Sequence, residues 1–128
     1  MKKKPIKKKT CLKETLDFNA FTKNSSINTT TMIIKRSILG VLKFKKIKLM
    51  EDYLFKCQLL KNNNIANKLN ENLAYYRILN RSRSSQRLKN IFWLWHINKK
   101  FNKLNFIRNI ISIFFITLNS IKKYGGLK

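Results

Sequence analysis

The sequence predicts a mainly α-helical, extended protein in which basic loops join short amphipathic helices and an irregular arm precedes them. Apolar residues recur at helical spacing in several segments. Three glycines and one proline are too few for the tight turns of a hairpin-rich β fold. The third observation is charge, because 29 Lys and Arg residues face 5 Asp and Glu residues among 128, for a formal net charge of +24. Such a chain repels itself and needs an external anion, which nucleic acid or an anionic membrane can supply.

Residues 1–31 are predicted to form a basic extension without regular structure. Lysines dominate its first part and polar residues its second part, and no apolar period persists over three helical turns. A targeting peptide is one interpretation, but Glu14 and Asp17 lie inside it and arginine is absent before Arg36. We favour a retained arm that lies along a polyanion, with a solvated tail as the alternative. Residues 32–128 are then expected to form the helical domain.

Three helices are predicted in this domain, over residues 32–61, 65–78 and 105–122. Gly40 weakens the first helix by about 1 kcal/mol relative to alanine, so a bend or break is expected there. The three asparagines at 62–64 are expected to end it. The apolar positions are Ile34, Ile38, Leu42, Leu49, Tyr53 and Leu60 in the first helix, Ile65, Leu69, Leu73 and Tyr76 in the second, and Ile110, Ile111, Ile113, Phe114, Phe115, Ile116, Leu118 and Ile121 in the third.

The apolar run of the last helix is too short for a bilayer span. It covers 12 residues, 110–121, whereas a span needs about 20. Arg108, Lys122 and Lys123 bracket this run. A buried helix is therefore favoured over a membrane span, and no membrane insertion is expected.

Residues that could carry catalysis or bind metal are scarce. His96 is the single histidine, and the two cysteines, Cys11 and Cys57, are too few and too far apart for a zinc site. No glycine-rich phosphate loop is present. Asp52 is expected to pair with Lys48 or Lys56 at a helical spacing of four. We therefore expect no catalytic residues, no metal, no cofactor and no enzymatic activity.

The stretch from Arg81 to Asn90 is the most informative candidate for binding. Arg81, Arg83 and Arg87 alternate with serines, and guanidinium groups and hydroxyls both bind phosphate oxygens. The pattern predicts a loop that is ordered when a partner holds it. The aromatic residues that follow either stack on unpaired bases or pack in the core; they are Trp93, Trp95 and His96.

At this loop the sequence resembles the small-subunit ribosomal protein fourteen family. That family carries Leu-Pro-Arg-Asn-Ser-Ser-Pro-x-Arg-x-Arg-Asn, which aligns with residues 79–90 without a gap. The identical positions are Leu79, Arg81, Ser84, Arg87 and Asn90, and Lys89 replaces a basic residue. Weaker matches flank the loop: Tyr53, Lys56, Leu60 and Lys61 before it, and Lys103, Leu104, Arg108, Gly126, Leu127 and Lys128 after it. Both loop prolines are absent, and the cysteine count excludes the zinc-binding branch.

This resemblance implies a structural component of the small ribosomal subunit that is ordered on ribosomal RNA in the subunit head and supports assembly and translation. Small-subunit proteins three, ten and nineteen would be its neighbours, with no small-molecule substrate. The Lys, Asn and Ile bias indicates an organellar ribosome, located in the mitochondrial matrix. One alternative is a small basic membrane-associated subunit of an organellar complex, and a second is a DNA-packaging protein. The predicted RNA-binding residues are Lys56, Lys61, Arg77, Arg81, Arg83, Ser84, Arg87, Lys89, Asn90, Lys99, Lys100, Lys103 and Arg108.

Overall fold

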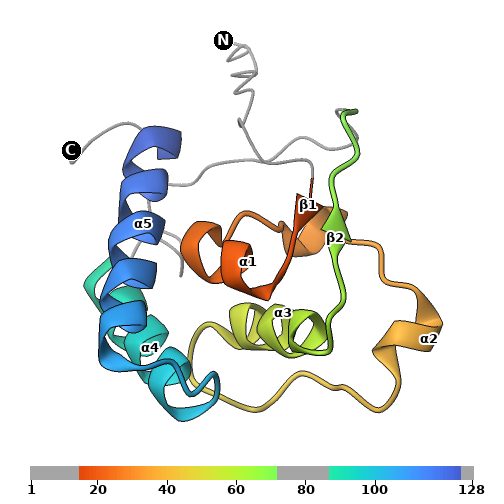
Figure 1. Cartoon of the computed structure of the whole chain (residues 1–128), viewed down its shortest axis with the longest axis horizontal. Coiled ribbons are helices and arrows are strands. Elements are labelled where there is room, and N and C mark those ends of the chain that lie inside the picture. Colours follow the sequence, from red (N-terminus) through yellow and green to blue (C-terminus); the bar gives the residue numbers. More distant parts are fainter. Residues whose placement is uncertain (1–14, 72–86, 125–128) are drawn as a thin grey trace, which may run out of the picture.

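The computed structural model describes residues 15–71 and 87–124, and this part is mainly helical, as predicted. Figure 1 shows α5 standing along one side of the molecule with α4 across its lower end, and α1 and α3 in the middle. The elements in chain order are β1 (Thr15–Leu16), α1 (Phe18–Asn24), a 3-10 helix (Thr29–Thr31), α2 (Arg36–Leu39), α3 (Glu51–Lys61), β2 (Ala66–Asn67), α4 (Arg87–Lys100) and α5 (Phe106–Tyr124).

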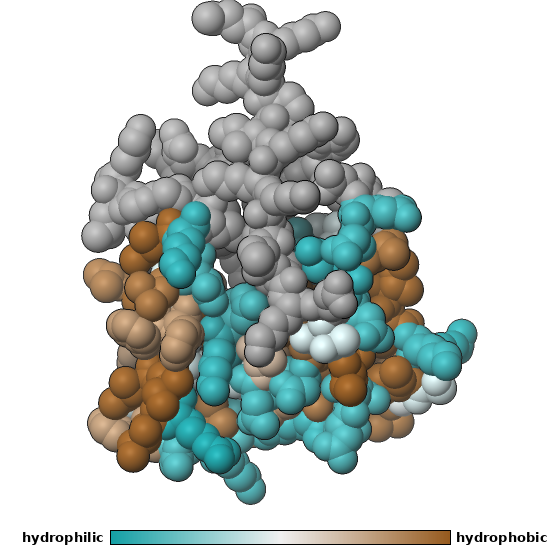
Figure 2. Space-filling model, turned by 45° about the horizontal axis from the view of Figure 1, so that its top comes forward, coloured by the Kyte–Doolittle hydropathy of each residue, from teal (hydrophilic) through white to brown (hydrophobic). Residues whose placement is uncertain are grey.

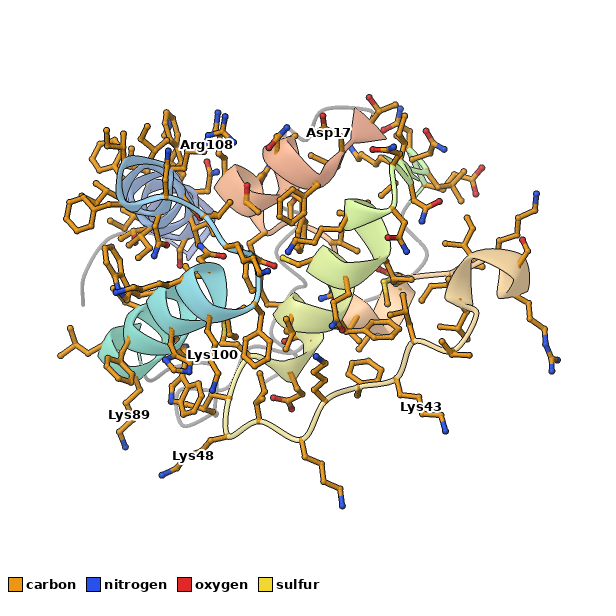
Figure 3. The ribbon with its side chains drawn as sticks, turned by 60° about the horizontal axis from the view of Figure 1, so that its bottom comes forward. Asp17, Lys43, Lys48, Lys89, Lys100 and Arg108 are labelled. Carbon is orange, nitrogen blue, oxygen red and sulfur yellow. The ribbon has the colours of Figure 1, made fainter. Side chains whose placement is uncertain are left out.

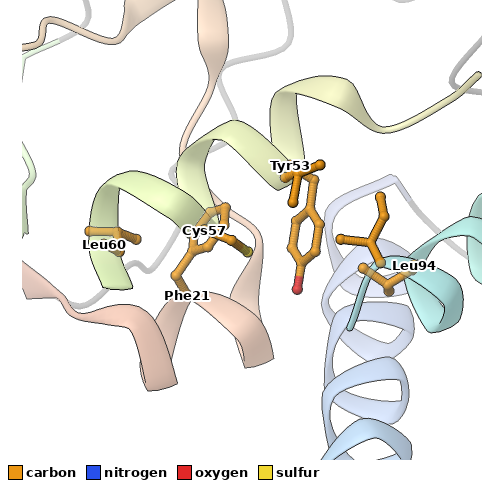
Figure 4. Close-up of a cluster of buried hydrophobic side chains, with 7 residues drawn as sticks. Phe21, Tyr53, Cys57, Leu60 and Leu94 are labelled. Atoms are coloured by element: carbon orange, nitrogen blue, oxygen red, sulfur yellow. The ribbon is translucent and has the colours of Figure 1, made fainter. Parts of the chain in front are cut away.

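The apolar core lies where α1, α3 and α4 meet. The rings of Phe21 and Tyr53 stack with their centroids 5.5 Å apart, and Figure 4 shows both side chains facing into the space between the helices. Ile113 and Ile116 of α5 pack against this cluster from the side. The buried members of the cluster are Phe21, Tyr53, Leu54, Cys57, Leu60, Leu94 and Ile97.

A buried hydrogen-bond network, here called the Asn98 hub, consists of Tyr53, Asn98, Asn102, Asn109 and Ser112. The Tyr53 hydroxyl and the Asn102 amide each donate to Asn98 Oδ1 over 2.9 Å. Asn98 Nδ2 donates to Asn109 Oδ1 at 3.1 Å and to Ser112 Oγ at 3.0 Å. A buried polar group that loses its partner costs free energy, so the paired groups of the hub fix how α3, α4 and α5 sit together.

The hub extends to the N-terminal part of the chain. The Ser112 hydroxyl donates to the backbone carbonyl of Thr22 in α1. Asn109 Nδ2 donates to the Trp95 carbonyl of α4 at 3.2 Å. Four helices are therefore linked through side chains that are almost fully buried.

Residues 15–31 are not irregular, contrary to the prediction for the arm. Asp17 caps α1 by accepting the Ala20 N–H at 2.7 Å, and Phe21 of this helix is only 1% exposed. β1 pairs antiparallel with β2, with Leu16 opposite Ala66. The prediction failed because α1 has only seven residues, too few to show a period over three turns. The division into an extension at 1–31 and a domain at 32–128 stays a prediction.

The predicted helix over residues 32–61 is interrupted. The break at Gly40 is confirmed: α2 ends there, and the glycine has a φ of 51°, in the left-handed region. No helix forms between Gly40 and Met50, because four lysines within residues 43–48 repel one another in a helix. The end of α3 at Asn62 agrees with the prediction.

The later elements agree with the sequence in part. α5 confirms the helix predicted at 105–122. Residues 65–71 contain β2 and no helix, and the rest of the predicted second helix lies outside the described residues. Residues 87–90 belong to α4 rather than to a loop. Within residues 15–71 and 87–124, none of the helices combines the length and apolarity that a membrane crossing requires.

Substitution of Asn98 by alanine should destabilise the fold by about 3 kcal/mol, because several buried partners lose their hydrogen bonds at once. Urea denaturation followed by circular dichroism measures this loss. Asn67→Ala is the matched control, since Asn67 is exposed on β2, and it should change the free energy of unfolding by less than about 0.5 kcal/mol. Equal losses in the two variants would contradict the hub.

Candidate anion-binding site

Lysines from three separate segments gather around Phe101, directly after α4. The ammonium of Lys45 lies 5.1 Å from the centre of the Phe101 ring, and that of Lys100 lies 5.7 Å from it. Lys61 Nζ donates to the Phe101 carbonyl oxygen at 2.8 Å. The negative face of an aromatic ring attracts cations. We call Phe101 with Lys45, Lys61, Lys100 and Lys103 the Phe101 cluster.

Two of these lysines lie at the ends of helices. Lys61 is the last residue of α3 and Lys100 the last of α4, so each lies at the negative end of a helix dipole, which favours a cation. The Phe101 N–H donates to the Ile97 carbonyl at 2.9 Å and continues the last turn of α4. Lys103 then adopts a φ of 53° as the chain turns toward α5.

The cluster is electropositive and open to solvent. Its four lysines are exposed and Phe101 is half-buried. Partial burial lowers the pKa of Lys61, and the charge of Lys103 lowers it further, while Cys57 acts in the opposite direction. In the described part of the chain, no carboxylate forms an ion pair with these lysines. Such a group of exposed lysines can bind an anion, and a phosphate suits lysine donors well.

Three of the predicted RNA-binding residues, Lys61, Lys100 and Lys103, fall in this cluster. Lys56 does not, because it is 4% exposed and its ammonium pairs with Asp52 at 2.9 Å. This pair confirms the prediction for Asp52. Lys56 cannot contact a ligand unless its ion pair with Asp52 breaks.

The remaining predicted binding residues lie elsewhere. Lys89 and Lys99 are exposed on α4, where Asn90 is half-buried, and Arg108 is exposed in the first turn of α5. Figure 3 shows Lys89 pointing outward, away from Lys100. Arg87 begins α4, and four further residues lie outside the described part: Arg77, Arg81, Arg83 and Ser84. The part these side chains play in binding stays a prediction.

Sequence reasoning missed Lys45. Its contact with Phe101 joins residues far apart in the chain, and nothing in the local sequence distinguishes it from the neighbouring lysines. The aromatic residues singled out in α4 pack against protein groups. Trp93 meets His96 edge-on at 5.7 Å, and Trp95 meets Phe106 at 5.6 Å.

The described residues offer no obvious nucleophile or metal site. No group of three potential metal ligands occurs among them. Cys57 is fully buried, and burial raises its pKa to about 11, so the thiol is protonated at neutral pH and unreactive. Burial alone would raise the pKa of Asp52, but the hydrogen bond and charge of Lys56 and the Thr29 hydroxyl together lower it.

Comparison with known proteins finds a similarity to a bacterial protein. The chain is 29% identical over 110 residues to the putative teichuronic acid biosynthesis glycosyltransferase TuaG of Bacillus subtilis. This match covers 86% of the chain but 44% of the relative, so the chain spans less than half the relative's length. No family model and no solved structure matches the chain.

This match contradicts the identification as a small-subunit ribosomal protein. It also contradicts the expected structural role in the ribosome, the expected lack of enzymatic activity, and the partners named, ribosomal RNA and ribosomal proteins. The resemblance rested chiefly on residues 79–90, a short stretch of arginines, serines and asparagines that a basic composition readily produces. The glycosyltransferase match extends over most of the chain. The mitochondrial location stays a prediction.

The ion pair between Asp52 and Lys56 gives a test that depends on pH. Asp52→Asn leaves the buried ammonium of Lys56 without its ion pair. The free energy of unfolding should fall by about 1–3 kcal/mol at neutral pH, which is less than for a fully buried pair because Asp52 is half exposed. The pKa of Asp52 is lowered in the folded protein, so its contribution to stability is fully present above the ordinary pKa of 3.8 and is lost as the pH falls through the lower pKa of the folded state.

Urea denaturation of both proteins across this pH range should show the difference in unfolding free energy shrinking in acid. The double variant Asp52→Asn/Lys56→Met is the control, and it should recover part of the loss because no charge stays buried. A difference that persists in strong acid would contradict this assignment.

Proposed function

We propose that this chain takes part in glycosyl transfer and that the Phe101 cluster binds the diphosphate of a nucleotide-sugar donor. The match to a glycosyltransferase supports the type of reaction. The main observation that supports this binding site is that Lys45, Lys61 and Lys100 all contact Phe101. A diphosphate carries the charge that this group of cations lacks.

Glycosyl transfer makes specific demands on such a site. The bond between the anomeric carbon and the donor's phosphate oxygen breaks, and the bonding electrons leave with the diphosphate. The acceptor hydroxyl oxygen forms the new bond to that carbon and loses its proton to a base. Negative charge therefore grows on the leaving diphosphate, and cations already held beside it lower the barrier.

The geometry of the cluster suits this role. Two ammonium groups lie 5.1 Å and 5.7 Å from the centre of the Phe101 ring, and the Phe101 carbonyl accepts a hydrogen bond from a third. The cations are therefore in place before the substrate arrives, which reduces the reorganisation that binding requires. The role proposed for this chain is to hold the donor and its leaving group.

Titration of the full chain with uridine diphosphate glucose, followed by isothermal calorimetry in low salt, tests the site. Lys45→Gln/Lys100→Gln should weaken binding at least about tenfold, because two charged hydrogen bonds to phosphate are lost. The matched control, Lys43→Gln/Lys89→Gln, removes the same charge from the same two segments. Both control lysines point away from the cluster (Figure 3), so affinity should change by less than about twofold.

Two results would contradict the proposal. One is the absence of saturable binding, and the other is an equal loss of affinity in the two double variants, which would indicate a response to total charge alone. Inorganic tripolyphosphate is the competing probe. It should displace the sugar nucleotide, because both ligands would bind the same lysines through phosphate oxygens.

A further inference from the structure

Helix α5 carries apolar residues on its outer side as well as its inner side. On the inner side, Asn109 and Ser112 are each 1% exposed and bound into the Asn98 hub, while Ile113 and Ile116 pack against the core. Its outer side is apolar, with Ile107 67% and Phe114 58% exposed. Figure 2 shows apolar side chains gathered in a band along one side of the molecule, where α5 lies. Such a continuous exposed apolar surface marks an interaction site.

The outer apolar residues follow the repeat of a helix-packing seam. Ile107, Ile111, Phe114, Leu118 and Ile121, here called the outer seam, are separated by four, three, four and three positions. This alternation keeps side chains in a line along a helix and is the pattern that a second helix covers. Leu118 is half-buried and the other four are exposed. The seam runs about 21 Å at 1.5 Å per residue, which is enough for four turns of a partner helix.

A hollow lies beside the seam and could receive a side chain of a bound partner. It lies between α4 and α5 and has a volume of about 440 Å³. An apolar side chain from a helix on the seam can enter it. Its lining residues are Ile91, Trp95, Ile110, Ile113, Phe114 and Thr117.

Charge selects the kind of partner. Arg108 and Lys122 are exposed near opposite ends of the seam, and their spacing of fourteen positions puts them on the same flank of the helix. A second copy of the chain would bring another net charge of +24 against this surface. An acidic helix instead meets complementary charge near both ends of the seam.

We propose that the outer seam binds an acidic amphipathic helix of another protein. The apolar stripe of that helix covers Ile107, Ile111 and Phe114, and its carboxylates pair with Arg108 and Lys122. The proposal goes beyond the proposed function and uses none of the residues of the Phe101 cluster. If the seam does not bind a helix, the proposal for donor binding is unaffected. If the Phe101 cluster does not bind a donor, the proposal for the seam is unaffected.

A fluorescent synthetic peptide of about three heptads, with leucine at the a and d positions and glutamate and alanine elsewhere, is the probe. Titration with the full chain, followed by fluorescence anisotropy, should show saturable binding with one peptide per chain. Ile107→Gln/Phe114→Gln should weaken binding at least about tenfold. Circular dichroism should show an unchanged fold, since both side chains are largely exposed.

Ile33→Gln/Val41→Gln is the matched control, because these apolar residues are 93% and 94% exposed and lie away from α5. This variant should bind as the original chain does. Arg108→Gln/Lys122→Gln should weaken binding and flatten its dependence on salt.

Several outcomes would overturn the proposal. These are no saturable binding, equal binding of a peptide with lysine in place of glutamate, and an equal loss in the Ile33 and Val41 control. Sedimentation showing a dimer that Ile107→Gln/Phe114→Gln dissociates would assign the seam to a second copy. Vesicles of phosphatidylglycerol that bind through the seam more tightly than the peptide would assign it to a lipid surface.

Discussion

The side-chain amide of Asn98 is the interaction on which the arrangement of the helices depends. It accepts from Tyr53 and Asn102 and donates to Asn109 and Ser112, which uses both of its donor hydrogens and its acceptor oxygen. Its residue is fully buried, so no water replaces a lost partner. Rotating α4 or shifting α5 by one residue would leave several of these groups unpaired at once, and the cost of each selects a single arrangement.

Both proposed binding surfaces follow from this arrangement. The hub requires the polar side of α5, with Asn109 and Ser112, to face inward, and the apolar outer seam is then left on the surface. At the other end of the network, Phe101 lies three residues after Asn98, where α4 stops, and the lysines of two other segments reach it there. A buried polar group thus positions both an apolar and a cationic surface.

The sequence predicts the helices better than it predicts what they contact. The apolar period at 105–122 is sufficient to identify α5, yet the same period suggests that the apolar side faces the core. Ile113 and Ile116 do pack against the core, but the outer seam faces outward, because Ser112 on the inner side finds its acceptor on Thr22, 90 positions away. No local pattern reveals that pairing. The short helix α1 escaped detection for a similar reason. Among 29 basic residues, charge alone does not single out Lys45, Lys61 and Lys100, and a twelve-residue basic motif led to the wrong family.

A double-mutant cycle between Asn98 and Ser112 tests the central claim most directly. The free energies of unfolding of Asn98→Ala, Ser112→Ala and the double variant are compared with that of the original chain. A direct hydrogen bond across α4 and α5 predicts that the two losses are not additive, with a coupling energy of about 1 kcal/mol or more. Strictly additive losses would mean that the two side chains do not interact. The hydrogen bonds of Asn98 would then not explain why the polar side of α5 faces inward.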